Sequence, residues 1–147
     1  VVLAEPSAPA YISASIETSA FDTRRTDAAA PLVVAYDIAA VAATDAAARE
    51  LVRPALGIVG EPDWYPHIAP LPFADDVAAL RERTGSPDAF AAALPDEWID
   101  ALALAGTADR VRAGIAERHA AGATSVVLTP IGADRSAALE DLAGALG

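Results

Sequence analysis

Three ring-bearing residues stand close together in the most proline-rich part of this 147-residue sequence. They are Trp64, Tyr65 and His67, within the run "GEPDWYPHIAPLPF". A histidine beside aromatic rings can contact a bound molecule or transfer a proton near neutral pH. The alternative is a histidine that is only packed among prolines. We predict that these three side chains bind substrate.

A fourth candidate is Asp37, which we place at the end of a second buried strand. It either hydrogen-bonds a substrate or cofactor, or it pairs with an arginine or caps a turn. We include Asp37 among the predicted substrate-binding residues, with the structural alternatives left open.

The composition excludes several other kinds of site. The sequence has no cysteine, so it offers no thiol nucleophile, disulfide or zinc-thiolate centre. Its histidines and acidic residues lack the spacing of a metal site. The formal net charge is -11, and all 10 basic residues are arginines scattered along the chain, which argues against a nucleic-acid or membrane partner. No apolar run approaches the ~20 residues that span a bilayer, so we expect a cytoplasmic protein with a small-molecule substrate.

Apolar patterning predicts strands that alternate with helices. The expected strands cover residues 1–4, 32–38 and 124–129. The expected helices cover residues 9–19, 44–55, 75–83, 87–94, 96–105, 107–122 and 134–146. Residues 57–95 form an insertion after the second strand, and residues 23–31 a polar connection. This order predicts an α/β fold with a parallel sheet and right-handed crossovers.

Some local signals refine these helices. Ser7, Thr44 and Thr107 are placed to accept a hydrogen bond from the first turn of a helix. Gly122 is placed to end a helix in the left-handed conformation. In the last helix we expect Leu139, Leu142 and Leu146 to face inward.

The predicted sheet is too small to be complete. Three short strands, apolar on both faces, would leave both outer edges without a partner. The chain also begins "VVLAEP", inside an apparent strand and without methionine. We expect that upstream sequence is missing, and that residues 1–147 are a single partial domain.

The run "ALPDEWIDALALAGTADRVRAGIAERHAAGATSVVLTPIG" resembles the C-terminal signature of the luciferase-like monooxygenases. That signature is a Leu-Pro-x-Glu helix, a Gly-Thr turn, a helix ending at glycine, a strand, a glycine-containing loop and a closing helix. The matching positions are Leu94-Pro95-Asp96-Glu97, Gly106-Thr107, Val111, Ala121-Gly122-Ala123 and Val126-Val127-Leu128. Ala108 replaces the usual proline after Thr107. The runs "VVLAEPSAPAY" and "LVVAYDIAAVAATDAAARELVRPAL" also resemble this family, so the resemblance covers nearly the whole chain.

The resemblance implies the C-terminal part, about three β/α units, of a TIM-type (β/α)8 barrel. Such proteins are oxidoreductases or monooxygenases that use FMN or the deazaflavin coenzyme F420, for hydride transfer or oxygen activation on a small organic substrate. The deazaflavin branch is favoured because the composition reflects GC-rich codons. Most catalytic residues of the family lie in the first strands, so the catalytic residues stay unknown here and the missing N-terminal half is a required partner.

The working face of a barrel lies at the carboxyl ends of its strands. The resemblance therefore places Asp37, Trp64, Tyr65 and His67 at the mouth. It also makes the loop at residues 4–7 one wall of the cofactor phosphate site, with Ala4, Glu5 and Ser7 as binding residues. Ala4 and Ser7 stand where deazaflavin enzymes often have threonine and lysine. Glu5 would repel a phosphate unless it points away, and Ser7 is otherwise an ordinary helix cap.

The alternative function is a stand-alone, non-catalytic α/β binding or interaction module. Such a module would have to cover its edge strands, for example by forming a homodimer. A start codon near Val1 would favour the module, whereas a further series of strands and helices upstream would favour the barrel.

Overall fold

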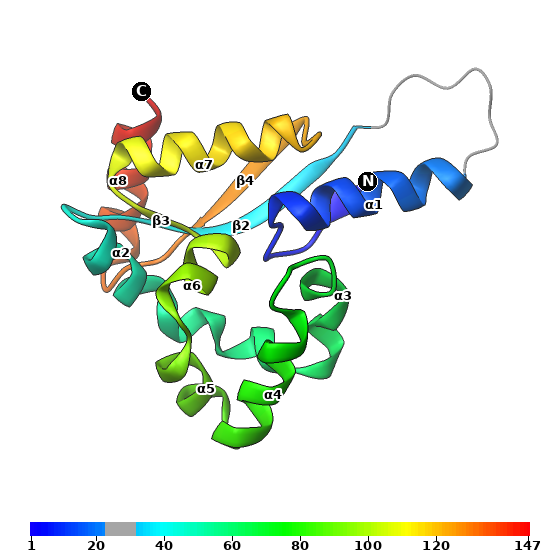
Figure 1. Ribbon diagram of the computed structural model, residues 1–147. Helices are drawn as coiled ribbons and strands as arrows, with labels where there is room; N and C mark the ends of the chain where they lie inside the picture. Colours follow the sequence, from blue (N-terminus) through cyan, green and yellow to red (C-terminus); the bar gives the residue numbers. More distant parts are fainter. Residues whose placement is uncertain (23–31) are drawn as a thin grey trace.

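The computed structural model describes residues 1–22 and 32–147, and the predicted connection over residues 23–31 lies outside them. The central element is β2 (Val34–Val41), which has parallel neighbours on both edges (Figure 1). The strand β4 (Ser125–Pro130) pairs along one edge. The short strands β1 (Val2–Leu3) and β3 (Leu104–Gly106) share the other edge, because Val34 pairs with β1 and β4 while Ala39 pairs with β3 and β4.

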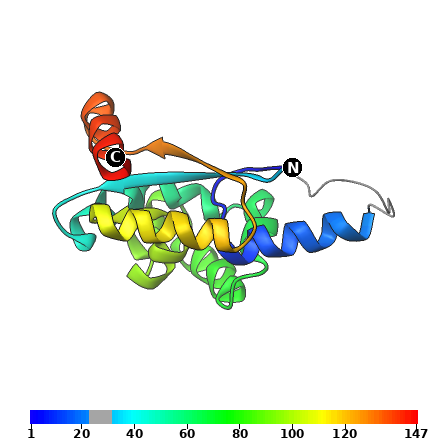
Figure 2. The ribbon, with the colours of Figure 1, turned by 90° about the horizontal axis from the view of Figure 1, so that it is seen from above.

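Three helices cover one face of this sheet: α1 (Pro9–Asp22), α7 (Ala108–Ala120) and α8 (Arg135–Leu146). Two apolar clusters lie between the helices and the strands, one beneath α1 and one beneath α7 and α8. Figure 2 shows α1 and α7 running along the sheet and α8 beside β4. None of the helices within the described residues is long and apolar enough to cross a membrane.

The opposite face of the sheet is covered only in part. The insertion folds into a helical lobe below the sheet (Figure 1) and packs on Ile38 and Ala40, near the carboxyl end of β2. The lobe extends beyond the insertion at both ends and consists of α2 (Asp45–Val52), η1 (Arg53–Gly60), η2 (Pro62–Trp64), α3 (Tyr65–Ile68), α4 (Ala74–Thr84), α5 (Pro87–Ala93) and α6 (Asp96–Leu102). Toward the amino end of β2 the same face exposes Val2 (71%), Tyr36 (37%) and Val127 (38%).

Several sequence predictions need correction. The helix expected over residues 96–105 ends at Leu102, and β3 follows it as a fourth strand. Asp37 lies in the middle of β2, not at its end. Of the three leucines of α8 that we expected to face inward, only Leu142 is buried, because Leu139 and Leu146 project away from the sheet and are more than half exposed. The predicted end of α7 is confirmed, since Gly122 has a φ of 112°.

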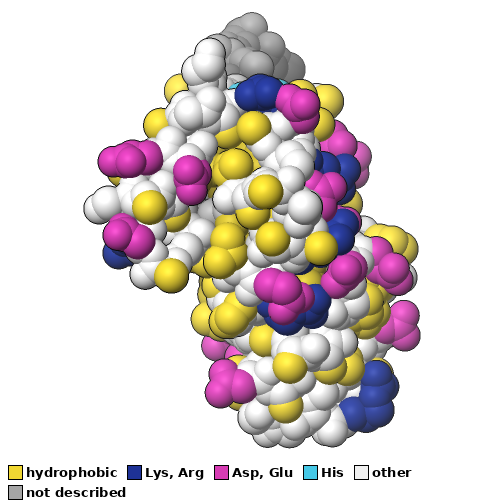
Figure 3. Space-filling model, turned by 90° about the vertical axis from the view of Figure 1, so that its left-hand side faces the viewer, with side chains coloured by type: hydrophobic (Ala, Val, Ile, Leu, Met, Phe, Trp, Pro, Cys, Tyr) yellow, Lys and Arg dark blue, Asp and Glu magenta, His cyan; other side chains and the backbone are white. Residues whose placement is uncertain are grey.

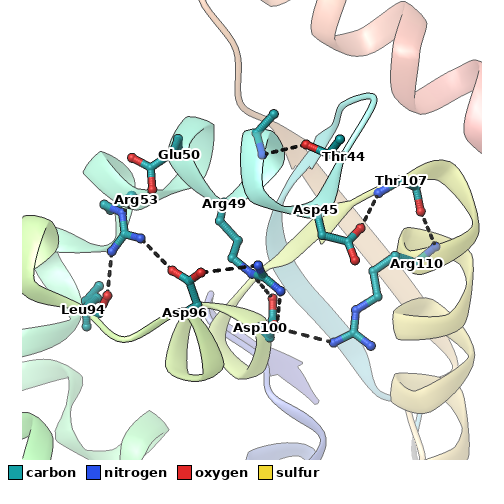
Figure 4. Close-up of polar contacts among 11 residues, drawn as sticks. Thr44, Asp45, Arg49, Glu50, Arg53, Leu94, Asp96, Asp100, Thr107 and Arg110 are labelled. Atoms are coloured by element: carbon teal, nitrogen blue, oxygen red, sulfur yellow. Dashed lines mark hydrogen bonds and ion pairs between the residues drawn. The ribbon is translucent and has the colours of Figure 1, made fainter.

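A network of ion pairs and hydrogen bonds links α2 to α6 and to the start of α7 (Figure 4). Arg49 of α2 binds Asp100 of α6 through two nitrogens, at 2.7 and 2.8 Å, and the bond to Asp100 raises the pKa of Arg49. Asp45, at the start of α2, accepts the backbone amide of Thr107 at 2.9 Å. A side chain at Gly106 would collide with the Asp45 carboxylate, at 2.7 Å. The Gly106-Thr107 pair therefore has a packing role.

Charged side chains of both signs lie beside each other on the face drawn in Figure 3, where hydrophobic side chains gather in the hollow between two lobes. The arginines on this face form no continuous positive patch. This distribution fits ion pairing within the protein better than binding to a polyanion, which needs clustered positive charge.

Two glycines in neighbouring helices make a matched test of the packing. A Cβ at Gly114 of α7 would lie 2.3 Å from Cδ2 of the buried Leu104, whereas a Cβ at Gly144 of α8 would meet nothing within 4 Å. We expect Gly114→Ala to lower the free energy of unfolding by about 1–3 kcal/mol. Gly144→Ala should raise it by about 0.5–1 kcal/mol through helix propensity. Chemical denaturation measures both, and equal effects would show that α7 is placed wrongly.

Candidate functional site

The carboxyl ends of β1 and β4 bring two polar side chains together. Glu5 follows β1 directly, and Thr129 is the fifth residue of β4. The Thr129 hydroxyl donates to Oε2 of Glu5 at 3.1 Å. Both side chains are half-buried. Thr129 and Pro130 therefore lie at the same end of the sheet as the loop at residues 4–7.

The insertion places an aromatic cluster over this loop. His67 stacks on Tyr11 of α1, with ring centroids 4.4 Å apart, and lies 5.1 Å from the ring of Trp64. Nδ1 of His67 is 3.2 Å from the carbonyl oxygen of Pro6. Because a carbonyl oxygen only accepts, Nδ1 carries the proton in this contact and Nε2 is the acceptor nitrogen of the neutral ring. No hydrogen bond to Nε2 is present among the described residues.

A small cavity opens between the loop and the insertion. Its volume is about 80 Å³. It is lined by Glu5, Pro6, Ile38, Ala55, Leu56, Ile58, Val59 and Trp64. Its walls are apolar except for Glu5. Glu5, Trp64 and, through Pro6, His67 thus belong to one site.

Tyr65 does not join this site. Its side chain is 48% exposed and lines a separate, larger hollow of about 690 Å³, between the η1–η2 segment and α4. That hollow also contains the ion pair between Arg81 and Glu61, at 2.6 Å. The predicted group of three aromatic residues is therefore divided, with Trp64 and His67 on one side and Tyr65 on the other.

Asp37 lies on the helix-covered face of the sheet, away from the cavity. Its Oδ2 accepts Nε of Arg118 at 2.5 Å, and its Oδ1 accepts the backbone amide of Ser7 at 3.0 Å. All three residues are at most 2% exposed. Burial raises the pKa of the Asp37 carboxyl, and this effect exceeds the lowering by the Arg118 charge and by both hydrogen bonds. The substrate role that we predicted does not fit this position, whereas pairing with an arginine does.

The loop at residues 4–7 does not fit the predicted phosphate site. Ser7 is completely buried, and its hydroxyl donates to the carbonyl oxygens of Leu3 and Ala4, at 3.2 and 3.1 Å. Its amide is bound to Asp37. Neither donor is available for an anion, and Glu5 adds a negative charge. Ser7 is not the helix cap either, because α1 begins two residues later at Pro9.

The sequence analysis missed two residues of this region. Arg118 lies seven residues after Val111, on the buried face of α7. A charged residue at that spacing on an otherwise apolar helix face is the signal of a buried ion pair. Tyr11 gave no signal, because only the tertiary fold brings it to His67. Among the described residues, no group of three or more histidine or acidic side chains is arranged to hold a metal ion.

The buried pair provides a stability prediction. Arg118→Met would leave Asp37 as a buried carboxylate without its cation, and should lower the free energy of unfolding by about 3–5 kcal/mol. Adding Asp37→Asn should restore more than half of this loss, because asparagine is neutral and still accepts the Ser7 amide. The control is Arg110→Met in the same helix. Arg110 is 46% exposed in its side chain and 3.9 Å from Asp100, so its loss should cost less than about 1 kcal/mol. Denaturant titrations of the four proteins decide this, and a double variant no better than the single one would contradict the pairing.

Comparison with known proteins gives matches among solved structures. No protein-family model matches the chain, and no curated protein matches its sequence significantly. Among solved structures, the chain is similar to the coenzyme F420-dependent tetrahydromethanopterin reductase from Methanopyrus kandleri. The TM-score is 0.66 and the sequence identity 24%, over 94% of this chain and 42% of the reductase.

This similarity supports the fold. The chain spans less than half of the reductase, and the low identity carries no residue-level correspondence. The protein is thus a mixed α/β structure with a parallel sheet, and its fold is similar to that of part of this reductase.

Proposed function

We propose that this chain forms the C-terminal part of a (β/α)8 barrel oxidoreductase that uses coenzyme F420 on a small organic substrate. The observation that carries the proposal is the match of 94% of the chain to an F420-dependent reductase. The parallel strands and their helix-covered outer face agree with a barrel wall. F420 is proposed rather than FMN because F420 is the coenzyme of the similar protein.

The uncovered surfaces support a barrel that continues beyond these strands. Val2, Tyr36 and Val127 expose apolar area on the face that would line a barrel interior. On the outside, Leu139 and Leu146 of α8 are exposed beside β4. Exposed apolar side chains that gather on one face can mark an interaction site. We propose that the N-terminal half of the barrel covers both surfaces.

The proposal assigns distinct tasks to the residues at the carboxyl ends. Trp64 and His67 would border the substrate, exclude water and fix its orientation. The bound coenzyme would supply or accept the hydride, as cofactors do in such enzymes. Both donors of Ser7 are engaged and Glu5 is negatively charged, so we place the coenzyme phosphate at another part of the barrel. Most catalytic groups would also come from the N-terminal half.

The direct test is coenzyme binding by the full-length protein. F420 and FMN are titrated separately, and binding is followed by the fluorescence of each coenzyme. We expect F420 to bind at micromolar concentrations and FMN at least tenfold more weakly. Binding of neither coenzyme would reject the oxidoreductase proposal, and a preference for FMN would reject its F420 branch.

The aromatic cluster supplies a kinetic prediction. In the full-length enzyme, Trp64→Ala and His67→Ala should each lower kcat/KM at least several-fold, because water would enter the site and the substrate would lose its apolar wall. Tyr65→Ala is the matched control, since Tyr65 faces the other hollow and should retain kcat/KM. Steady-state kinetics with reduced F420 and a thermal melt are measured for each variant. Loss of activity that only follows unfolding, or an equal loss in the Tyr65 variant, would contradict the assignment.

A further inference from the structure

Glu5 is a half-buried carboxylate without a cationic partner among the described residues. Its only hydrogen bond among the described residues is the one from Thr129, to Oε2. Elsewhere in the described chain the arginines near the sheet are engaged with other carboxylates, and Arg118 is bound to Asp37. A carboxylate has about four acceptor positions, and ionised groups are costly to bury without partners. Glu5 is thus equipped to accept a further hydrogen bond.

The cavity beside Glu5 has the size of a small functional group. A water molecule occupies about 30 Å³ of the liquid, so 80 Å³ holds a group of about three non-hydrogen atoms. The other seven lining residues are apolar or aromatic. A ligand group that fills this space therefore has an apolar stem and presents its polar end to Glu5.

The local charge favours a cation at that position. Asp37 and Arg118 cancel each other, which leaves Glu5 as the net charge of the cluster. The negative charge of Glu5 reaches the neighbouring pair, where it is one of the causes that raise the pKa of Asp37. The loop also presents hydrogen-bond acceptors to its neighbours. The Pro6 carbonyl accepts a hydrogen bond from His67, and the Glu5 carboxylate accepts one from the Thr129 hydroxyl. These groups match a donor and repel an anion.

Trp64 also favours the binding of a cation. Its indole lines the same cavity as Glu5. The indole face attracts a cation within about 6 Å of the ring centroid. His67, 5.1 Å away, and through it Tyr11 hold this ring in place. An anion would gain nothing from this wall.

We propose that Glu5, Thr129 and Trp64 form a subsite for a primary ammonium group carried on a short apolar stem. Glu5 accepts the charged hydrogen bond, Thr129 orients the carboxylate, and Trp64 covers the cation. That this subsite binds the substrate rests on the proposed oxidoreductase function. If it does, the substrate is an amine. The binding of an ammonium group itself does not depend on that function.

The test uses the full-length protein and three small probes of similar size. Ethylammonium, ethanol and acetate are titrated at constant ionic strength and pH 7, and their binding is measured by saturation-transfer NMR. We expect ethylammonium to bind at least tenfold more tightly than either ethanol or acetate. Equal binding of the three probes, tighter binding of acetate, or no binding of ethylammonium would overturn the proposal.

Variants locate the site. Glu5→Gln keeps the shape and removes the charge, so ethylammonium affinity should fall at least tenfold while a thermal melt confirms folding. Glu17→Gln, an exposed carboxylate of α1, is the matched control and should bind like the wild type. Should Glu5→Gln fail to fold, Trp64→Leu keeps an apolar wall without the indole and should lower the affinity at least threefold. Unchanged binding in the folded Glu5 variant, or in Trp64→Leu where that variant is used, would overturn the proposal.

F420 titration of the same samples separates the two proposals. Binding of F420 without ethylammonium would overturn the ammonium subsite and retain the oxidoreductase. Binding of ethylammonium without F420 would retain the subsite and reject the oxidoreductase.

Discussion

Asp37 and Arg118 join three segments that are far apart in the sequence: β2, α7 and the loop at residues 4–7. Their charges are buried between the sheet and α7, and the Ser7 amide completes the hydrogen bonding of Asp37. An ion pair of this kind gains little net stability over an apolar pair, but removal of one partner is costly. Its effect is therefore on geometry. It fixes the distance of α7 from β2 and the path of the chain after β1.

That fixed path determines what the loop can bind. The Ser7 amide and hydroxyl are turned toward Asp37 and toward the carbonyls of Leu3 and Ala4. The Pro6 carbonyl and the Glu5 carboxylate belong to the site, and both accept hydrogen bonds. The loop lies between a strand and a helix and in outline resembles an anion site. Both donors of Ser7, however, are used to assemble the fold.

Sequence patterns anticipated what depends on short-range chemistry. Thr44 and Thr107 cap their helices as expected, because the cap bond spans only three residues. The insertion and the parallel order of the strands were also predicted, since they follow from apolar periods and chain order. The division of Tyr65 from Trp64 and His67 was not predictable. It depends on where η2 ends and α3 begins, which tertiary packing decides.

The wrong predictions for Asp37 and Leu139 have one physical origin. In both cases the sequence does not determine which face of the strand or helix is covered. Asp37 was expected at a strand end, where its side chain could reach a ligand. In mid-strand it has only two directions, because successive side chains alternate. Tyr36 faces the uncovered side and Asp37 faces the helices. Leu139 shows the same error on a helix. The apolar residues of α8 cover a wider face than the described sheet can bury, so Leu139 is left exposed.

The same alternation separates structure from function along β2. Asp37 turns toward α7 and holds the working loop from behind, while Ile38 turns the other way and lines the cavity under Glu5. Asp37 thus stabilises the fold on one face of the sheet, while its neighbour Ile38 lines the cavity on the other face. A shift of β2 by one residue would bury Tyr36 under α7 and place the Asp37 charge in the cavity beside Glu5. Two carboxylates facing each other in an apolar cavity would repel strongly. The register of β2 is therefore fixed by the ion pair on one face and by the negative charge of the site on the other.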